Sequence, residues 1–258
     1  MDLGIRGRSA IVMGGSRGLG KACAMALASE GVAVTIGART ASTVDATVAE
    51  IRAAGGQASG VAVDLRTPEG RAKLVAACPS PDILVTNCQG PVPRPFHEIE
   101  REHWVAALDD IFFAPLEMVR AVYDGMLARQ FGRVISISSR SVKNPQIDLP
   151  LSNGSRAALH GFLAGISRQG IARNVTINTV SPGVFDTDAQ RRHVEGLVKE
   201  TGRPFDEIWR SRAASSPANR FGRAEELGNY VAFLCSAHAG YITGQTLLVD
   251  GGNYPGTL

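Results

Sequence analysis

The chain has 258 residues, of which 44% are hydrophobic and 20% are charged, and a formal net charge of +3. This balance suits a globular protein with a substantial core, and the small, scattered charge argues against a nucleic-acid partner. No segment has the length and apolarity of a transmembrane helix, and the first residues lack the apolar run of a signal peptide. The four cysteines show no C-x-x-C pair and no metal-ligand spacing. We therefore predict a cytoplasmic protein without a metal site.

Short apolar segments alternate with helical patterns along the first third of the chain. Strands are predicted at residues 9–13, 32–36, 58–63 and 83–86. Helices are predicted to run to about residue 29 and over residues 41–54 and 68–77, the last with Thr67 as its N-cap. This rhythm predicts an α/β fold of the Rossmann type, in which a doubly wound parallel sheet carries helices on both faces.

The remaining elements bring the sheet to about seven strands. A helical pattern covers residues 100–129, and Pro115 is expected to kink or break it. Strands follow at 133–137, 175–180 and 246–249, and helices at 152–169 and 225–237. Residues 185–216 are polar and irregular with two short helical stretches, which is typical of a lid or substrate loop. Without repeats or a linker, we expect one domain over residues 1–258.

The first strand is followed by a glycine-rich turn, Gly14-Gly15-Ser16-Arg17-Gly18-Leu19-Gly20, which opens the first helix. Glycines let the backbone approach a pyrophosphate, and the N–H groups of a helix N-terminus bind its negative charge. The position of this turn in the first β-α-β unit predicts a dinucleotide site rather than an ordinary tight turn.

The end of the second strand bears on the choice of dinucleotide. An NAD site usually has a carboxylate there, bound to the ribose 2′-hydroxyl, whereas an NADP site has a cation for the 2′-phosphate. Here the stretch reads Gly37-Ala38-Arg39-Thr40, and Arg17 supplies a second guanidinium. We predict NADP(H) in preference to NAD(H); the alternative is that both arginines are ordinary surface residues.

The spacing Gly-x-x-x-Gly-x-Gly and several later motifs resemble the short-chain dehydrogenases/reductases from about Arg8 to Gly252. The later motifs, in chain order, are Asp64-Leu65, Asn87, Ser139, Ser181-Pro182-Gly183 and Asp250-Gly251-Gly252. The resemblance implies an oxidoreductase that acts on a small-molecule substrate and forms a homodimer or homotetramer. It also implies that Asp64 and Leu65 lie near the adenine, that Asn87 and Gly90 line the ribose, and that Pro182, Gly183, Val184 and Thr187 hold the nicotinamide end.

The proton-transferring Tyr-x-x-x-Lys of that family is missing. The matching residues are Ser152 and Arg156, and none of the four tyrosines has a lysine four residues further on. Ser139 lies thirteen residues before Ser152, at the family's interval for the catalytic serine, although Ser138 and Ser141 are close competitors. Ile111 stands where the family has an asparagine. The catalytic candidates are therefore Ser139, Ser152 and Arg156.

These replacements leave several functions open. A serine hydroxyl is a much weaker acid than a phenol, Ser152 could be only a helix cap, and an arginine cannot relay a proton. Our first prediction is NADP(H)-dependent carbonyl reduction or alcohol oxidation on a small or acyl-type substrate, with the proton delivered by another group. Candidate groups are Lys143, Asp148, Asp186, Asp188 and His97. The alternatives are a catalytically silent NADP(H)-binding sensor or scaffold, and a non-redox lyase or isomerase.

Overall fold

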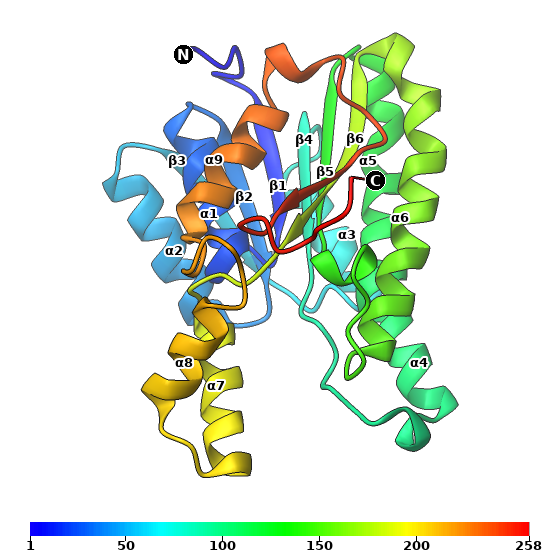
Figure 1. Cartoon of the computed structure of the whole chain (residues 1–258). Helices are drawn as coiled ribbons and strands as arrows, with labels where there is room; N and C mark the ends of the chain where they lie inside the picture. The colour runs from blue at the N-terminus through cyan, green and yellow to red at the C-terminus, as the bar shows by residue number, and fades with distance from the viewer. Residues whose placement is uncertain (258) are drawn as a thin grey trace.

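The computed structural model describes residues 1–257. Within them a seven-stranded sheet runs in the order β3-β2-β1-β4-β5-β6-β7, and every neighbouring pair is parallel (Figure 1). The strands are β1 (Ser9–Met13), β2 (Ala33–Ala38), β3 (Gln57–Ala62), β4 (Ile83–Asn87), β5 (Gly132–Ile137), β6 (Val175–Pro182) and β7 (Thr246–Val249). The predicted Rossmann-type α/β fold is confirmed.

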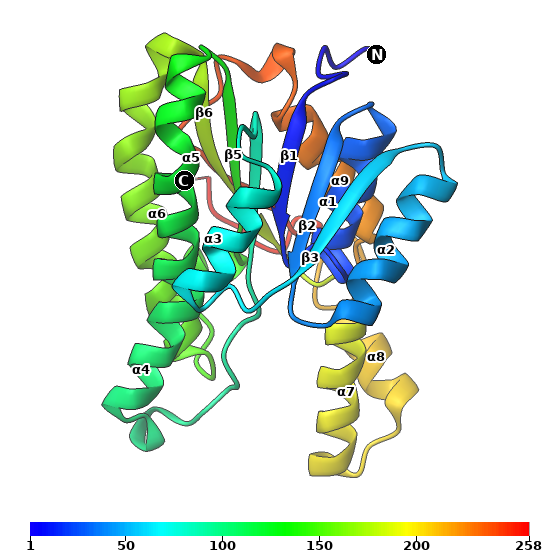
Figure 2. The same ribbon diagram turned by 180° about the vertical axis from the view of Figure 1, so that it is seen from behind.

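Helices cover both faces of the sheet, as Figures 1 and 2 show from opposite sides. They are α1 (Gly18–Ser29), α2 (Ala41–Ala53), α3 (Pro68–Ala77), α4 (Arg101–Leu108), α5 (Ala114–Ala128), α6 (Pro150–Gly170), α7 (Asp188–Thr201), α8 (Phe205–Ala213) and α9 (Ala224–Leu234). One core packs α1, α2 and α9 on the sheet, and the other packs α3, α5 and α6 on the opposite face. Alternate residues of β1 serve the two cores: Ala10 and Val12 face one, and Ile11 and Met13 face the other.

Most predicted boundaries hold to within a few residues. Strand β1, helix α3 and strand β7 begin and end where the sequence places them, and the Thr67 hydroxyl accepts a hydrogen bond from the Gly70 N–H at 3.0 Å. Helix α6, however, begins at Pro150 with Leu149 as its N-cap. The alternative that Ser152 caps this helix is therefore wrong, because Ser152 lies inside the first turn.

The long helical pattern after β4 is interrupted near Pro115 but does not end there. Pro115 lies in the first turn of α5 and cannot donate the N–H hydrogen bond that a continuous α-helix would make at that position. The five residues before α5, Asp109–Phe113, form a π-helical turn that links α4 to α5. On α4, the Trp104 ring packs against Gly154 of α6: a Cβ added to that glycine would lie 2.9 Å from the ring. Helix α4 is thus held against the start of α6.

Residues 185–216 form a hairpin of two helices, α7 and α8, which lie side by side beyond the carboxyl edge of the sheet in both views (Figures 1 and 2). We call these residues the α7–α8 segment. Its first residue, Phe185, forms a short bridge with Gly222, a few residues beyond the end of the segment. No helix within residues 1–257 has the length and apolarity needed to cross a membrane.

Candidate functional site

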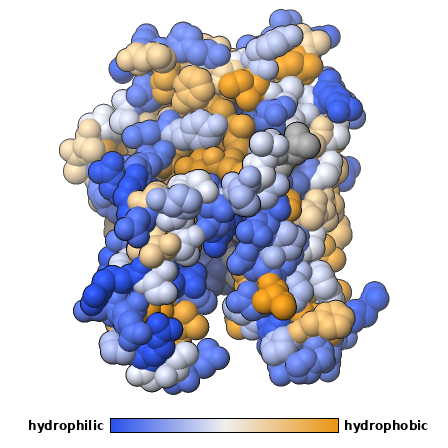
Figure 3. Space-filling view, viewed as in Figure 1, coloured by the Kyte–Doolittle hydropathy of each residue, from blue (hydrophilic) through white to orange (hydrophobic). Residues whose placement is uncertain are grey.

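A cleft of about 780 Å³ opens at the carboxyl edge of the sheet, between the α7–α8 segment and α4. The space-filling view shows the molecule hollowed there, with mostly hydrophilic side chains at the mouth (Figure 3). Many of the predicted cofactor residues line the cleft: Gly14, Ser16, Arg17, Gly18, Leu19, Arg39, Asp64, Leu65, Asn87, Gly90 and Thr187. We call the part around the glycine-rich turn and Arg39 the glycine-turn end, and the neighbouring region of Ser139, Ser152 and Arg156 the serine end.

The glycine-rich turn cannot carry side chains at its key positions. Gly14 and Gly18 have φ angles of +60° and +52°, in the left-handed region that favours glycine. A Cβ on Gly20 would lie 2.3 Å from the carbonyl oxygen of Gly14. Helix α1 starts at Gly18, and its N-cap, Arg17, makes no side-chain cap hydrogen bond. The first N–H groups of the helix are therefore left for an anion, and the turn fits a pyrophosphate.

Two other segments meet the glycine-rich turn. The Asn87 side-chain amide, at the end of β4, donates to the Gly14 carbonyl oxygen at 3.4 Å. Thr187 faces Gly18, since a Cβ there would lie 3.7 Å from the Thr187 methyl group. The Thr187 hydroxyl also caps α7 by accepting from the Gln190 N–H at 3.3 Å. The turn is thus held from one side by β4 and faced from the other by the start of α7.

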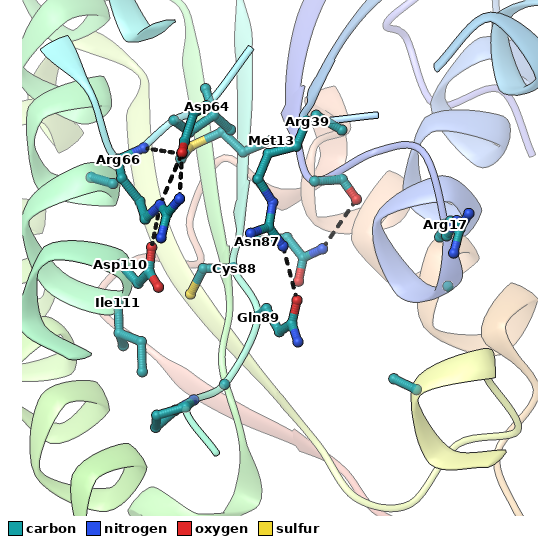
Figure 4. A pocket seen from close by; sticks show the side chains of 18 of the residues that line it. Met13, Arg17, Arg39, Asp64, Arg66, Asn87, Cys88, Gln89, Asp110 and Ile111 are labelled. Atoms are coloured by element: carbon teal, nitrogen blue, oxygen red, sulfur yellow. Dashed lines mark hydrogen bonds and ion pairs between the residues drawn. The ribbon is translucent and has the colours of Figure 1, made fainter. Parts of the chain in front are cut away.

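Two guanidinium groups border the glycine-turn end without an acidic partner. Arg39 Nη2 donates to Gln89 Oε1 at 3.1 Å, as Figure 4 shows, and Arg17 stands apart from it in the same view. Across residues 1–257, neither arginine forms an ion pair. Both are exposed. Free cations at this place fit the 2′-phosphate of NADP(H).

Unlike these two arginines, the Asp64 carboxylate has a partner of opposite charge, Arg66. Arg66 Nη2 lies 2.5 Å from one carboxylate oxygen, and Arg66 Nε donates to the group at 3.0 Å. These hydrogen bonds from Arg66 lower the pKa of Asp64 to about 2. Arg66 also lies 3.8 Å from Asp110 in the π-helical turn, where burial raises the pKa of the Asp110 carboxyl. Sequence analysis did not single out Arg66 or Asp110, although Arg66 stands only two residues after the Asp64 motif.

The serine end holds a buried pair on α6. Ser152 and Arg156 are one turn apart, 6% and 7% exposed, and Arg156 Nε donates to the Ser152 hydroxyl oxygen at 3.1 Å. A Cβ on Gly90 would lie 3.7 Å from Arg156 Nη2, so the guanidinium lies against the cleft wall. Ser139 follows β5, and its hydroxyl oxygen accepts from the Ser141 N–H at 3.1 Å. In both serines the oxygen is used as an acceptor, which leaves the hydroxyl proton to be donated.

Several predicted residues lie outside the cleft lining. Ser152 lines a small neighbouring hollow with Asp148 and with Pro91–Arg94 of the loop after β4. Pro182 is the last residue of β6 and pairs with Val249 of β7. A Cβ on Gly183 would lie 2.8 Å from Asp250 Cα, so this glycine allows close packing beside the last strand. The structure therefore brings Ser152 and Asp148 together at one hollow, and it gives Gly183 a packing role.

Sequence analysis missed His160. It lies one turn beyond Arg156 on α6 and is 7% exposed, with Nε2 2.6 Å from the Ser138 hydroxyl and Nδ1 3.2 Å from the Thr246 hydroxyl. Burial, and then the charge of Arg156, lower its pKa to about 4. The imidazole is therefore neutral at pH 7. The sequence did contain a signal for it, because Ser152, Arg156 and His160 are spaced four residues apart and so lie on one face of the helix.

The other proton-donor candidates are placed differently. His97 is 81% exposed and does not line the cleft, and Asp186 forms an ion pair with Arg191 at 2.9 Å. Asp188 borders the cleft at the start of α7. The part of the chain that the structure describes, residues 1–257, has no cluster of side chains suited to a metal ion.

The fold and the sequence both have close counterparts among known proteins. A family model described as enoyl-(acyl carrier protein) reductase matches residues 14–253. The chain is 31% identical to the NADPH-dependent reductase BacG of Bacillus subtilis (strain 168), covering 95% of this chain and 97% of that protein. It is also 31% identical to an acetoacetyl-CoA reductase of Allochromatium vinosum, over 95% of this chain and 98% of the relative.

A solved structure gives a close spatial match. L-sorbose reductase from Gluconobacter frateurii, complexed with NADPH and L-sorbose, superposes with a TM-score of 0.94 and 30% identity, covering 99% of this chain and all of that one. These relatives are oxidoreductases, and several are named or solved with NADPH. With this agreement in sequence and fold, the chain belongs to the enoyl-(acyl carrier protein) reductase group of the short-chain dehydrogenases/reductases.

Proposed function

We propose that the protein is an NADP(H)-dependent oxidoreductase that reduces a carbonyl group of a small or acyl-type substrate, or oxidises the corresponding alcohol. The observation that carries this proposal is the cleft in which a glycine-rich helix N-terminus and two unpaired arginines meet. The relatives support it, because BacG is named as an NADPH-dependent reductase and L-sorbose reductase is solved with NADPH and a ketose.

Each part of the cofactor has a complementary group in the chain. The first N–H groups of α1 suit the pyrophosphate, and Arg39, with Arg17 nearby, suits the 2′-phosphate. The remaining contacts that we propose are Asp64 and Leu65 at the adenine, Asn87, Gly90 and Arg156 at the riboses, and Pro182, Gly183, Val184 and Thr187 at the nicotinamide. When bound, NADPH supplies a hydride.

The serine end can stabilise the oxygen of the reacting carbonyl. The hydroxyls of Ser139 and Ser152 each retain a proton to donate, and negative charge develops on that oxygen as the hydride arrives. Arg156 strengthens the Ser152 donor, because its Nε–H bond to the hydroxyl oxygen polarises the O–H bond. Neither Ser152 nor Arg156 can release a proton readily near pH 7. We propose that another group delivers it, and Asp148, which lines the same hollow as Ser152, is a candidate.

Steady-state oxidation of NADPH against a panel of ketones and quinones tests this proposal. We expect Ser139→Ala to lower kcat/KM about 100-fold, the size of effect seen when a hydrogen-bond donor to a developing oxyanion is lost. We expect Ser152→Ala to lower it about 10-fold, the size of an ordinary hydrogen bond. The double change Ser152→Tyr with Arg156→Lys should raise activity, because it restores an acidic phenol beside an ammonium group. Turnover that is unaffected by Ser139→Ala would contradict the proposed site.

A silent NADP(H)-binding protein is the second candidate. It is favoured by one observation: Ser152 and Arg156 are bonded to each other, and neither is a general acid at neutral pH. Melting temperature measured with NADPH and with NADH separates the two, since a ligand that binds only the folded state raises it. A shift with NADPH and no turnover on any ketone supports the silent protein; no shift with either nucleotide contradicts both candidates.

We also propose that the whole chain is one domain with residues 185–216 as its lid, and that it forms a homodimer or homotetramer. Val105 of α4 and Phe113 of the π-helical turn support self-association, because both are large apolar side chains that are 47% and 44% exposed. Light scattering coupled to size exclusion measures the mass, and Val105→Asp with Phe113→Asp should shift it to the monomer. A monomeric wild type contradicts this proposal.

A further inference from the structure

A group of cations lies between the loop after β5 and the α7–α8 segment, beside the serine end. Arg140 directly follows Ser139, and its guanidinium is bonded to the Asn253 side chain. Asn253 in turn donates to the carbonyl oxygen of Ser215, three residues beyond Arg212 of α8. Lys143, from the same loop as Arg140, lies 5.9 Å from the centre of the Tyr254 ring. The loop and the end of α8 therefore meet through the last turns of the chain.

Among the described residues, these cations form no ion pair, in contrast to several other arginines of the molecule. Arg66, Arg71, Arg129, Arg191, Arg203 and Arg220 all lie within 4 Å of a carboxylate. Over the described range 1–257, Arg140, Lys143, Arg156 and Arg212 form no ion pair. Arg156 is nine-tenths buried in that state. A buried charge without a counter-charge is costly unless hydrogen-bond acceptors or a ligand compensate it.

Two buried donors without an acceptor lie at adjacent ends of the two helices of the α7–α8 segment. Of the side-chain nitrogens in residues 1–257, only Gln190 Nε2 and Arg212 Nε are fully buried without a hydrogen-bond acceptor. Gln190 lies in the first turn of α7 and Arg212 near the end of α8, and these two ends are adjacent in the hairpin (Figures 1 and 2). Buried donors are almost always satisfied in folded proteins, so two together call for a missing acceptor.

The neighbouring titratable groups support a positive environment. Burial, and next the charge of Arg140, lower the pKa of Arg212, while Asp148 opposes them. Burial, and next Arg212, lower the pKa of His193 on the inner face of α7. Asp148 is the acid common to both effects, and it is exposed. Donors and positive charge therefore exceed acceptors here, in a place next to Ser139 and Ser152.

We propose that this region binds an anionic group of the substrate, with Arg212 and Gln190 of the α7–α8 segment donating to it and Arg140 adding charge. The inference rests on the proposed function, since it names the substrate class of the same site: a small carbonyl compound that also carries a carboxylate or a phosphate. Because the loop after β5 carries both Ser139 and Arg140, we expect the anionic group and the carbonyl in the same small molecule.

Binding measured apart from turnover tests this inference. The NADP⁺-saturated protein is titrated by calorimetry with two matched pairs: 3-oxobutanoate against its methyl ester, and dihydroxyacetone phosphate against dihydroxyacetone. We expect one anion to bind about 10- to 100-fold more tightly than its neutral partner, the size of a charge-assisted hydrogen bond, and to weaken with added salt. The pair that shows the preference identifies carboxylate or phosphate.

Variants of α8 provide the controls. Arg212→Gln should remove the preference, Arg212→Lys should keep part of it, and Arg210→Gln should leave it unchanged, because Arg210 is exposed and bonds only to the Asp206 carbonyl oxygen. Equal binding of charged and neutral partners overturns the inference, as does a preference that survives Arg212→Gln or failure of both anions to bind below about 10 mM. Anion binding that depends on Arg212, without any NADPH oxidation, would contradict the proposed redox activity and leave the anion site standing. Turnover without a preference for the charged substrates would contradict the anion site and leave the redox activity standing.

Discussion

The glycine-turn end of the cleft and the serine end beside the cleft are built in different ways. At the glycine-turn end the ligand-facing groups are mostly backbone, fixed by close approaches such as the 2.3 Å that would separate a Gly20 Cβ from the Gly14 carbonyl oxygen. At the serine end they are side chains on α6 and on the loop after β5, such as Ser152 and Arg156. Backbone groups depend on the fold, whereas side chains can be exchanged without disturbing it. One end can therefore change its chemistry while the other continues to bind the same kind of ligand.

The largest effect is expected from a substitution in the glycine-rich turn. Gly20→Ala places a methyl group against the Gly14 backbone, which cannot move away as a flexible side chain can. We expect the free energy of unfolding to fall by about 3 kcal/mol and the stabilisation by NADPH to vanish in thermal melts. Gly161→Ala on α6 is the matched control, because nothing lies within 4 Å of its Cβ position, and it should gain about 0.5–1 kcal/mol. Equal behaviour of the two variants would contradict the close approach.

The next prediction concerns the serine end and its buried imidazole. The pKa of His160 is about 4 in the folded protein against 6.5 normally, so below pH 6.5 the unfolded chain takes up a proton that the folded chain does not. The stability contribution is complete above about pH 6.5 and is lost as the pH falls to about 4, a change of about 3 kcal/mol. Urea unfolding at pH 7 and pH 4 measures it. His160→Gln should flatten this dependence, and His97→Gln, at an exposed site, should not.

A smaller effect is expected on the preference of the glycine-turn end for NADPH over NADH. Arg39 is free of acidic partners, and its bond to Gln89 is a neutral one that a phosphate can replace. We expect Arg39→Ala to weaken NADPH binding about 10- to 100-fold and to leave NADH binding unchanged, as measured by fluorescence titration. Arg120→Ala on the exposed side of α5 is the control. A parallel loss for both nucleotides would mean that Arg39 supports the cleft generally and does not read the 2′-phosphate.

The smallest effect on stability is expected from the ion pair between Arg66 and Asp64. Arg66 is half exposed and Asp64 is one third exposed, so the low pKa of Asp64 translates into less than about 1 kcal/mol of stability. Because that pKa is depressed to about 2, the contribution is present above pH 3.8 and is lost as the pH falls through 2. Arg66→Gln should therefore lower the unfolding free energy slightly at pH 7 and not at all near pH 2, and a loss of several kcal/mol would show a larger structural role.

The sequence predicts the fold well because the strands are short apolar runs between clear breaks. Strands β1 and β7 and helix α3 are bounded by such signals, and Thr67 caps α3 as its residue type suggests. The start of α6 is harder to predict, since Pro150 in its first turn extends the helix beyond the regular pattern. The π-helical turn at Asp109–Phe113 has no local sequence signal that distinguishes it from a proline-induced break.

Some residues of the candidate site can likewise be predicted from the sequence, and others cannot. The glycine-rich turn, Arg39 and Asp64 are recognisable because their roles depend on nearby residues in one β-α-β unit. His160, Gln190 and Arg212 cannot be recognised in this way, because their roles depend on residues far away in the sequence. His160 contacts Ser138, which lies 22 residues earlier. The unsatisfied donors of Gln190 and Arg212 become evident only once the two helices of the α7–α8 segment are packed together.

The π-helical turn between α4 and α5 has a consequence for how this protein tolerates deletions. A π-helical turn holds one residue more than the α-helix needs, so removing one residue from Asp109–Phe113 leaves a continuous helix instead of a break. The surplus residue is taken up within that turn, so its loss keeps α4 close to its present orientation relative to α5. Trp104 then stays against Gly154, on the part of α6 that carries Ser152 and Arg156. The same deletion within α5 would instead turn α4 by about 100° and move Trp104 away from Gly154.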